Sequence, residues 1–139
     1  MKREQFIVHV VDPDPAIGEG LTILLNTYGM QVQSYPDAES FLEAHPDLCS
    51  RGCCLLVEAN LPGQSGPALL QRVRNEGSES PAILLLSTAY PEQIKQVRST
   101  SRISVMEKPL VNGRLIEELL KLRRETQNYL APDRTVPPL

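Results

Sequence analysis

The sequence contains no tryptophan and few other aromatic residues, with two phenylalanines and four tyrosines among 139 residues. No apolar run approaches the roughly 18 residues of a membrane-spanning helix, and Met1-Lys2-Arg3 does not lead into the apolar core of a signal peptide. The shortage of aromatic side chains disfavours a flavin site. The missing apolar runs predict a cytoplasmic protein without membrane contact.

The sequence also has no excess of positively charged residues. The formal net charge is −3, whereas domains that hold nucleic acid usually present a basic surface. We therefore expect no direct nucleic-acid binding by this chain. The 41% hydrophobic and 22% charged residues are typical of one globular domain.

The three cysteines, Cys49, Cys53 and Cys54, lie in one cluster. No second cluster of histidine or cysteine completes the four ligands of a structural zinc site. A disulfide framework is not expected in a cytosolic domain large enough to bury a core. We therefore expect Cys53 and Cys54 to be small apolar side chains at the start of a buried strand.

Short apolar runs alternate along the chain with segments of helical periodicity. Apolar runs bounded by turn residues predict buried strands, and apolar residues at spacings of three and four predict helices. The predicted strands are 6–11, 30–35, 54–58, 82–86 and 102–106. The predicted helices are 15–28, a short helix after Asp37, 67–77, 91–99 and 115–124.

This alternation predicts an α/β protein with a flavodoxin-like, three-layer (βα)5 fold. Its sheet should hold five parallel strands in the order 2-1-3-4-5. Residues 1–128 are predicted to form this domain. Residues 129–139, which include three prolines, are predicted to be a linker or C-terminal tail.

Polar residues follow four of the predicted strands at the point where each strand ends: Asp12, Glu58, Ser87 and Lys108. The carboxyl ends of parallel strands meet at one edge of a sheet, so these side chains should converge on one crevice. Any one of them alone would be interpreted as a cap or a solvated loop residue. Four at equivalent positions indicate a functional site.

The motifs at these positions resemble the receiver domain of two-component response regulators, especially receivers that precede LuxR-type DNA-binding domains. The resemblance spans residues 5–125. It rests on Val10-Val11-Asp12, the LPGQSG segment Leu61–Gly66, a hydroxyl after Ile83–Leu86, and Glu107-Lys108-Pro109. It implies that an aspartate after the third strand accepts a phosphoryl group from a histidine kinase with the help of Mg²⁺. In phosphoryl transfer the protein supplies position and charge, and the cation offsets the negative charge.

Part of this machinery can be carried over residue by residue. Asp12 matches the first acid of the pair that holds Mg²⁺, and Lys108 matches the lysine that engages the phosphoryl group. Ser87 or Thr88 matches the hydroxyl. Asn60, two positions after the acceptor, would supply a backbone carbonyl to the cation.

Three residues depart from the family pattern. Pro13 stands in place of the second acid and offers a cation no ligand, and Val105 stands where receivers usually have an aromatic switch residue. Glu58 stands in place of the acceptor aspartate. Its extra methylene moves the carboxylate by about 1.5 Å, and a displacement of that order can cost about a hundredfold in a positioned reaction.

The remaining charges predict a different pocket. The formal charge of the pocket is −1, because two acids, Asp12 and Glu58, face one lysine, Lys108. We therefore expect no cofactor, or at most weak Mg²⁺ binding by Asp12, Glu58 and Asn60. Lys108 is expected to pair directly with Glu58, and Ser87 is able to donate to it. Two interpretations of this pocket stay open: Glu58 is a fixed surrogate for the activated form, or the pocket is inert.

These departures predict an atypical, non-enzymatic receiver, or pseudo-receiver, that acts by phosphorylation-independent protein contacts and regulates an output such as transcription. Its partners would be an output domain or a second copy, with a histidine kinase as a further candidate. The expected contact face is formed by the fourth helix, fifth strand and last helix. Its exposed candidates are Lys95, Arg98, Arg102, Arg114, Glu117, Glu118 and Lys121.

Two alternatives stay open. The first is a working phosphoacceptor that uses Glu58 or a metal site rebuilt with Asp14. The second is a flavodoxin-like ligand binder, which is less favoured because Asp12–Gly18 is not a glycine-rich phosphate loop.

Overall fold

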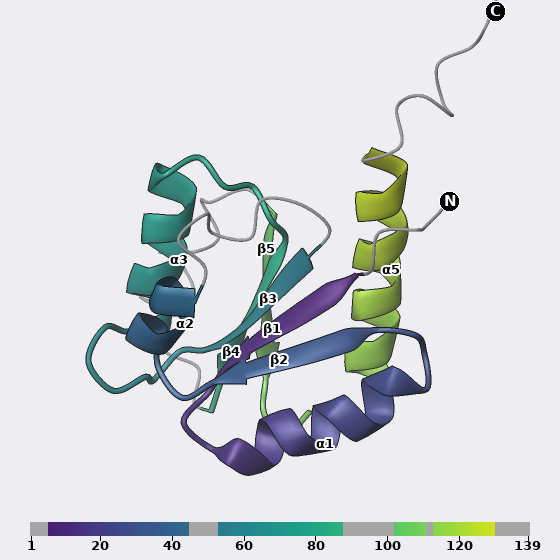
Figure 1. The fold of residues 1–139 in the computed structure, drawn as a ribbon, viewed down its shortest axis with the longest axis horizontal. Coiled ribbons are helices and arrows are strands. Elements are labelled where there is room, and N and C mark those ends of the chain that lie inside the picture. Colours follow the sequence, from purple (N-terminus) through teal and green to yellow (C-terminus); the bar gives the residue numbers. More distant parts are fainter. Residues whose placement is uncertain (1–5, 45–52, 88–101, 111–112, 130–139) are drawn as a thin grey trace, which may run out of the picture.

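The structure is a computed structural model that describes residues 6–44, 53–87, 102–110 and 113–129. The described residues form five strands and four helices (Figure 1). In chain order they are β1 (Ile7–Val11), α1 (Pro15–Asn26), β2 (Gln31–Tyr35), α2 (Ala38–Ala44), β3 (Cys53–Glu58), α3 (Gly66–Asn75), β4 (Ala82–Leu86), β5 (Ile103–Glu107) and α5 (Arg114–Tyr129). The helix predicted at 91–99 lies outside the described residues.

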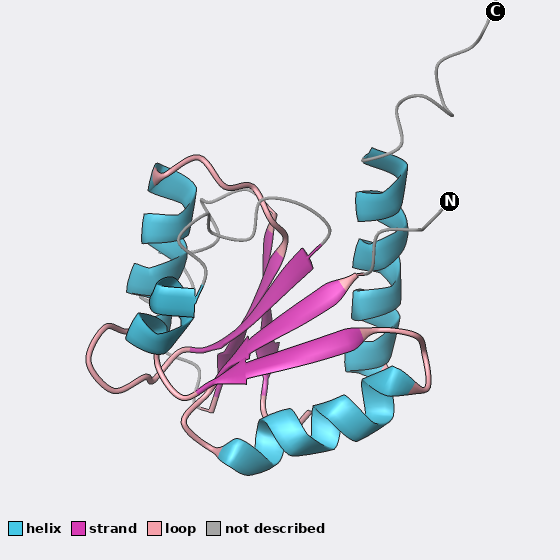
Figure 2. Cartoon of the chain, in the orientation of Figure 1, coloured by secondary structure: helices cyan, strands magenta, loops and turns pink. Residues whose placement is uncertain are grey.

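All strand pairs are parallel, and the order in the sheet is β2-β1-β3-β4-β5. The predicted fold class and strand order are therefore confirmed. Helices α1 and α5 cover one face of the sheet, and α2 and α3 cover the other (Figure 2). The predicted linker begins at residue 129, which is the last residue of α5, and the remainder of it lies outside the described residues.

The central strands explain why the sheet is buried on both faces. Every residue of β3 and β4 is buried, as expected for strands whose sequence is a continuous apolar run. Their side chains divide between two cores. Leu56 and Ile83 pack toward α1 and α5, whereas Leu55 and Leu84 pack toward α2 and α3.

The helix starts follow the capping residues in the sequence. The side chain of Asp14 accepts a hydrogen bond from Ala16 N at 3.0 Å before α1. Ser65 Oγ accepts one from Ala68 N at 3.2 Å before α3. Such caps satisfy backbone N–H groups that have no partner within the helix.

Helix α5 is longer than predicted. Its buried positions Leu119, Leu122 and Thr126 continue at helical spacing, so the helix runs to Tyr129 and has no basic residue in its last turn. Arg123, which lies inside the helix, instead donates a hydrogen bond to the backbone oxygen of Tyr28 at 2.6 Å. This bond connects α5 to the end of α1.

The cysteines differ from one another. Cys54 is a free, fully buried thiol. Burial, with a smaller contribution from the negative charge of Glu118, raises its pKa to about 12, so it is not a reactive thiolate. Cys53 is disulfide-bonded, so the expectation that it is only a small apolar side chain is wrong, although it is buried at the start of β3 as expected. Within the described ranges, no helix is long and apolar enough to cross a membrane.

Candidate functional site

Three of the four predicted site residues meet at the carboxyl edge of the sheet. Lys108 Nζ lies 2.9 Å from Asp12 Oδ2 and 2.5 Å from Glu58 Oε1. Asp12 follows β1, Glu58 ends β3 and Lys108 follows β5. Because β4 lies between β3 and β5, the lysine side chain reaches across the end of β4 to both acids.

The backbone of Lys108 is held in place for this reach. Lys108 N donates to the backbone oxygen of Leu86, the last residue of β4, at 2.7 Å. The peptide bond that follows, between Lys108 and Pro109, is cis. The position of the ammonium is therefore fixed by the edge of the sheet as well as by its two acidic partners.

Each carboxylate uses its other oxygen to hold its own loop. Asp12 Oδ1 accepts a hydrogen bond from Asp14 N at 2.8 Å, and Glu58 Oε2 accepts one from Asn60 N at 2.8 Å. In both cases the donor lies two residues after the acid. The two strand ends therefore present the same arrangement, in which one oxygen faces the local backbone and the other faces Lys108.

The electrostatics of the cluster favour the charged form of the lysine. Asp12 and Glu58 are buried, and the Lys108 side chain is 20% exposed. Burial alone would lower the pKa of Lys108, but its close pairing with Glu58, its hydrogen bond to Asp12 and the negative charges of both acids outweigh this effect, so that the pKa is raised. The contact with Glu58 Oε1 is a close charge pair rather than a well-angled hydrogen bond.

The loop after β3 fits tightly against the glutamate. Gly66 N donates to the backbone oxygen of Ala59 at 3.0 Å. A Cβ atom at Gly66 would lie 2.3 Å from the backbone oxygen of Glu58, so no side chain can be accommodated there without a shift. Sequence reasoning used this glycine only as part of a motif and missed its steric role.

The other predicted residues surround the cluster without joining it. Ser87 is exposed just after β4 and makes no hydrogen bond to Glu58 within the part of the chain that the structure describes, and Thr88 lies outside that part. Asn60 is exposed and contributes its backbone N–H to Glu58. Val105 is half-buried opposite Leu84, against the core under α2 and α3.

Residues 8–120 match the family model described as the response regulator receiver domain. The chain belongs to this family. Receiver domains are signalling domains that interact with histidine kinases and output domains. Membership removes the support for the flavodoxin-like ligand binder.

Several curated relatives are named as transcriptional regulatory proteins. The chain is 30% identical over 108 residues to the transcriptional regulatory protein FixJ of Bradyrhizobium diazoefficiens, covering 78% of this chain and 52% of FixJ. It is 29% identical over 113 residues to FixJ of Azorhizobium caulinodans, covering 81% and 53%. The chain thus spans about half the length of these relatives.

Solved structures share the fold. The crystal structure of FixJ-N matches with a TM-score of 0.73 and 24% identity, covering 88% of this chain and 96% of that one. A CheY-like receiver domain protein from Methanospirillum hungatei matches with a TM-score of 0.79 and 19% identity, covering 91% and 99%. These likenesses establish the receiver fold and not a shared mechanism.

Proposed function

We propose that this receiver domain does not run the aspartyl-phosphate cycle and acts in two-component signalling through phosphorylation-independent protein contacts. The observation that carries the proposal is the position of Lys108, whose ammonium is paired with both Glu58 and Asp12. The output would be transcription, because FixJ and other relatives are transcriptional regulatory proteins. The resemblance places Glu58 at the position of the acceptor aspartate.

The charge of the cluster supports this proposal. The family pattern implies three acids and one lysine, with a divalent cation to offset the excess negative charge. Here Pro13 replaces one acid, and the ammonium of Lys108 already contacts the two that remain. Mg²⁺ prefers octahedral oxygen ligands and loses its waters reluctantly, so the residues present do not fit such a site.

The ligand count leads to the same conclusion. Among the residues that the structure describes, no group of three His, Cys, Asp or Glu is placed to hold a metal ion. Asp14, the residue that could rebuild such a site, uses one carboxylate oxygen to cap α1. To bind here, a cation would have to displace Lys108. It would also have to disrupt the cap formed by Asp14 or bind through water.

The geometry of Glu58 supports the proposal as well. One oxygen is paired with Lys108 and the other accepts from Asn60 N, so an attacking oxygen would first have to give up a buried contact. The pairing therefore keeps the pocket in one arrangement. We propose that this fixed arrangement replaces the switch between unphosphorylated and phosphorylated states.

The proposed contacts involve the face formed by β5, α5 and the helix predicted at 91–99, which lies outside the described residues. On this face Arg102, Arg114, Glu117 and Lys121 are exposed, whereas Glu118 is half-buried and accepts a hydrogen bond from Ser104 Oγ at 3.3 Å. Lys95 and Arg98 lie outside the described residues. The proposal includes a cytoplasmic location, no enzymatic activity, no cofactor, and no direct contact with nucleic acid or membrane.

Phosphorylation by a small phosphodonor tests the proposal. The chain is incubated with the donor and Mg²⁺, and its intact mass is measured over time beside a receiver known to accept phosphate. The expected result is no gain of a phosphoryl group. The matched variant carries Pro13→Asp and Glu58→Asp, which restore the family's acids, and it is expected to gain one phosphoryl group in the presence of Mg²⁺.

A Mg²⁺-dependent gain of one phosphoryl group by the unmodified chain would overturn the proposal. Loss of that gain in Glu58→Gln would then assign the glutamate as the acceptor. Failure of the double variant to gain mass would show that Pro13 and Glu58 are not what blocks the cycle.

A further inference from the structure

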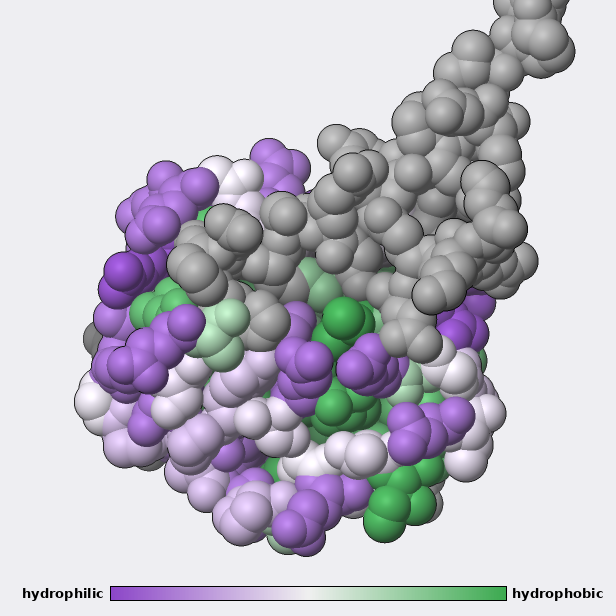
Figure 3. Space-filling view, in the orientation of Figure 1, coloured by the Kyte–Doolittle hydropathy of each residue, from purple (hydrophilic) through white to green (hydrophobic). Residues whose placement is uncertain are grey.

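The outer face of α1 is apolar, although the helix lies at the surface. Ile23, Leu24 and Tyr28, which lie in α1 or directly after it, are 74%, 40% and 41% exposed. Glu19 is the only charged residue in Pro15–Asn26. Figure 3 shows strongly hydrophobic surface at the lower right, where Figure 1 places the C-terminal half of α1. Surface helices normally direct charged residues toward water, so solvent alone does not account for this face.

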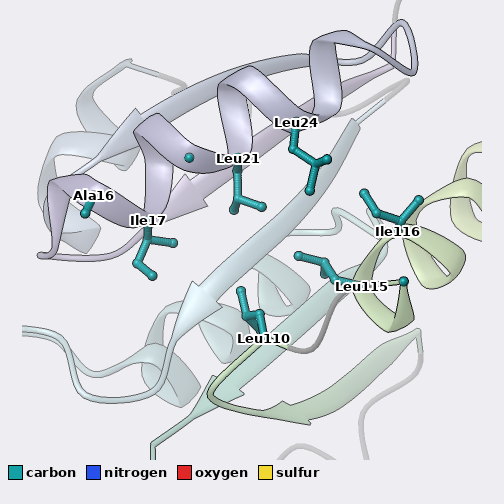
Figure 4. Close-up of a pocket in the computed structure, with 9 residues that line it drawn as sticks. Ala16, Ile17, Leu21, Leu24, Leu110, Leu115 and Ile116 are labelled. Atoms are coloured by element: carbon teal, nitrogen blue, oxygen red, sulfur yellow. The ribbon is translucent and has the colours of Figure 1, made fainter.

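An apolar groove of about 200 Å³ runs beside this face, between α1 and the start of α5. Leu24 lines one side, and Leu110, Leu115 and Ile116 line the other (Figure 4). Small-molecule sites usually enclose about 300–1,000 Å³ and contain a few polar groups. The groove is smaller than that and predominantly apolar, so it suits an apolar side chain better than a metabolite.

Gly20, which also lines the groove, is a further sign that a neighbour can approach closely. It lies in the middle of α1, is exposed, and a Cβ atom added to it would meet nothing within 4 Å. Neither its own packing nor a positive φ requires glycine there, and glycine weakens a helix interior relative to alanine. With exposed Ala16 one turn earlier, it leaves a smooth path on which another helix can approach closely.

We propose that α1 forms the contact surface of a dimer of this chain, in which Ile23 of each copy fills the groove of the other. Ala16 and Gly20 also line the groove. At 100° per residue, Ile23 lies on one side of them, and the groove residues Leu21 and Leu24 lie on the other. A two-fold axis running roughly along α1 brings these two sides together. A projecting side chain and a matching hollow on one surface are what a self-complementary interface needs.

The charges around this surface also suit a second copy. Glu19 lies on the side of Ile23, one turn before it, and exposed Arg114 lies beside Leu115 of the groove. The proposed axis places Glu19 of one copy near Arg114 of the other, at the edge of the contact. Helix α1 carries no second charge that would oppose the approach of another copy. The dimer needs no phosphorylation and does not depend on the arrangement of Glu58.

Sedimentation velocity of the 139-residue chain, from micromolar to millimolar concentration, tests the dimer. Two variants change the surface without touching the core: Ile23→Glu, and Gly20→Arg, which adds a better helix former but blocks close approach. The control is Gln71→Glu, an exposed change on α3. The expected result is a dimer for the unmodified chain and the control, with dissociation constants raised about tenfold or more in both variants.

Circular dichroism and thermal unfolding of the same samples separate loss of the dimer from loss of the fold. Both variants are expected to keep the helical content of the unmodified chain and to unfold cooperatively, with no more than the loss of thermal stability that follows from losing the dimer. A monomer throughout the concentration range would overturn the proposal. So would a dimer that neither variant weakens, because such a dimer uses another face.

Discussion

Removal of the Lys108 ammonium is expected to destabilise the fold by leaving two buried carboxylates without their cation. In Lys108→Met, the contacts of 2.9 Å to Asp12 and 2.5 Å to Glu58 are lost. Loss of one partner of a buried ion pair costs about 3–5 kcal/mol. Since the side chain is 20% exposed, we expect the free energy of unfolding at pH 7 to fall by about 2–3 kcal/mol. Urea denaturation of both proteins measures this fall in the free energy of unfolding.

The pH dependence of this difference follows from the raised pKa of Lys108. The lysine gains affinity for its proton on folding, so its contribution is complete below the unfolded pKa of about 10.4. It is lost as the pH rises through the higher pKa of the folded state. Titratable groups that do not contact Lys108 are the same in both proteins and cancel in the comparison. The difference between Lys108→Met and the unmodified chain should therefore be constant near neutral pH and shrink above pH about 10.4.

A matched control is Lys121→Met, because Lys121 is an exposed lysine in the same region of the chain. Its free energy of unfolding should change by no more than about 0.5 kcal/mol. A loss below about 1 kcal/mol for Lys108→Met would refute the reasoning, because exposed ion pairs account for effects of that size. A difference that does not shrink at alkaline pH would refute it equally.

Four further substitutions test the site, the cap of α3 and helix α1 by urea denaturation. Glu58→Gln leaves Lys108 one acidic partner and should cost about 1–2 kcal/mol; a loss equal to that of Lys108→Met would contradict the shared pairing. Gly66→Ala should cost about 1–3 kcal/mol because its Cβ meets the backbone oxygen of Glu58 at 2.3 Å. Gly20→Ala, by contrast, should stabilise α1 by about 0.5–1 kcal/mol. Equal effects of the two substitutions on the free energy of unfolding would contradict the steric argument. Ser65→Ala removes the cap of α3 and should cost about 1 kcal/mol, and no change would show that the cap does not contribute.

The fold could be predicted because its signals are local and agree with one another. The apolar runs of β3 and β4 belong to strands buried on both faces, and the more alternating β2 is at an edge of the sheet. Asp14 and Ser65 begin their helices as N-caps. Helix α5 runs to Tyr129, past the predicted end at residue 124, because buried positions continue at helical spacing as far as Thr126.

The site could be predicted as far as topology determines it. Parallel strands bring Asp12, Glu58 and Lys108 to one edge, and the structure confirms that they meet there. The hydrogen bond from Asn60 N to Glu58 and the close approach of Gly66 were not predicted. Both depend on the path of the backbone after β3, which residue type and spacing do not specify.

Titration with Mg²⁺, followed by the backbone amide signals of Asp14 and Asn60, tests the central claim most directly. These amides donate to Asp12 and Glu58, so a cation seated between the two acids must shift both signals. We expect no saturable shift in the unmodified chain at millimolar Mg²⁺, and saturable shifts in the Pro13→Asp, Glu58→Asp variant. Saturable shifts of both amides in the unmodified chain would show that Lys108 does not take the place of the cation.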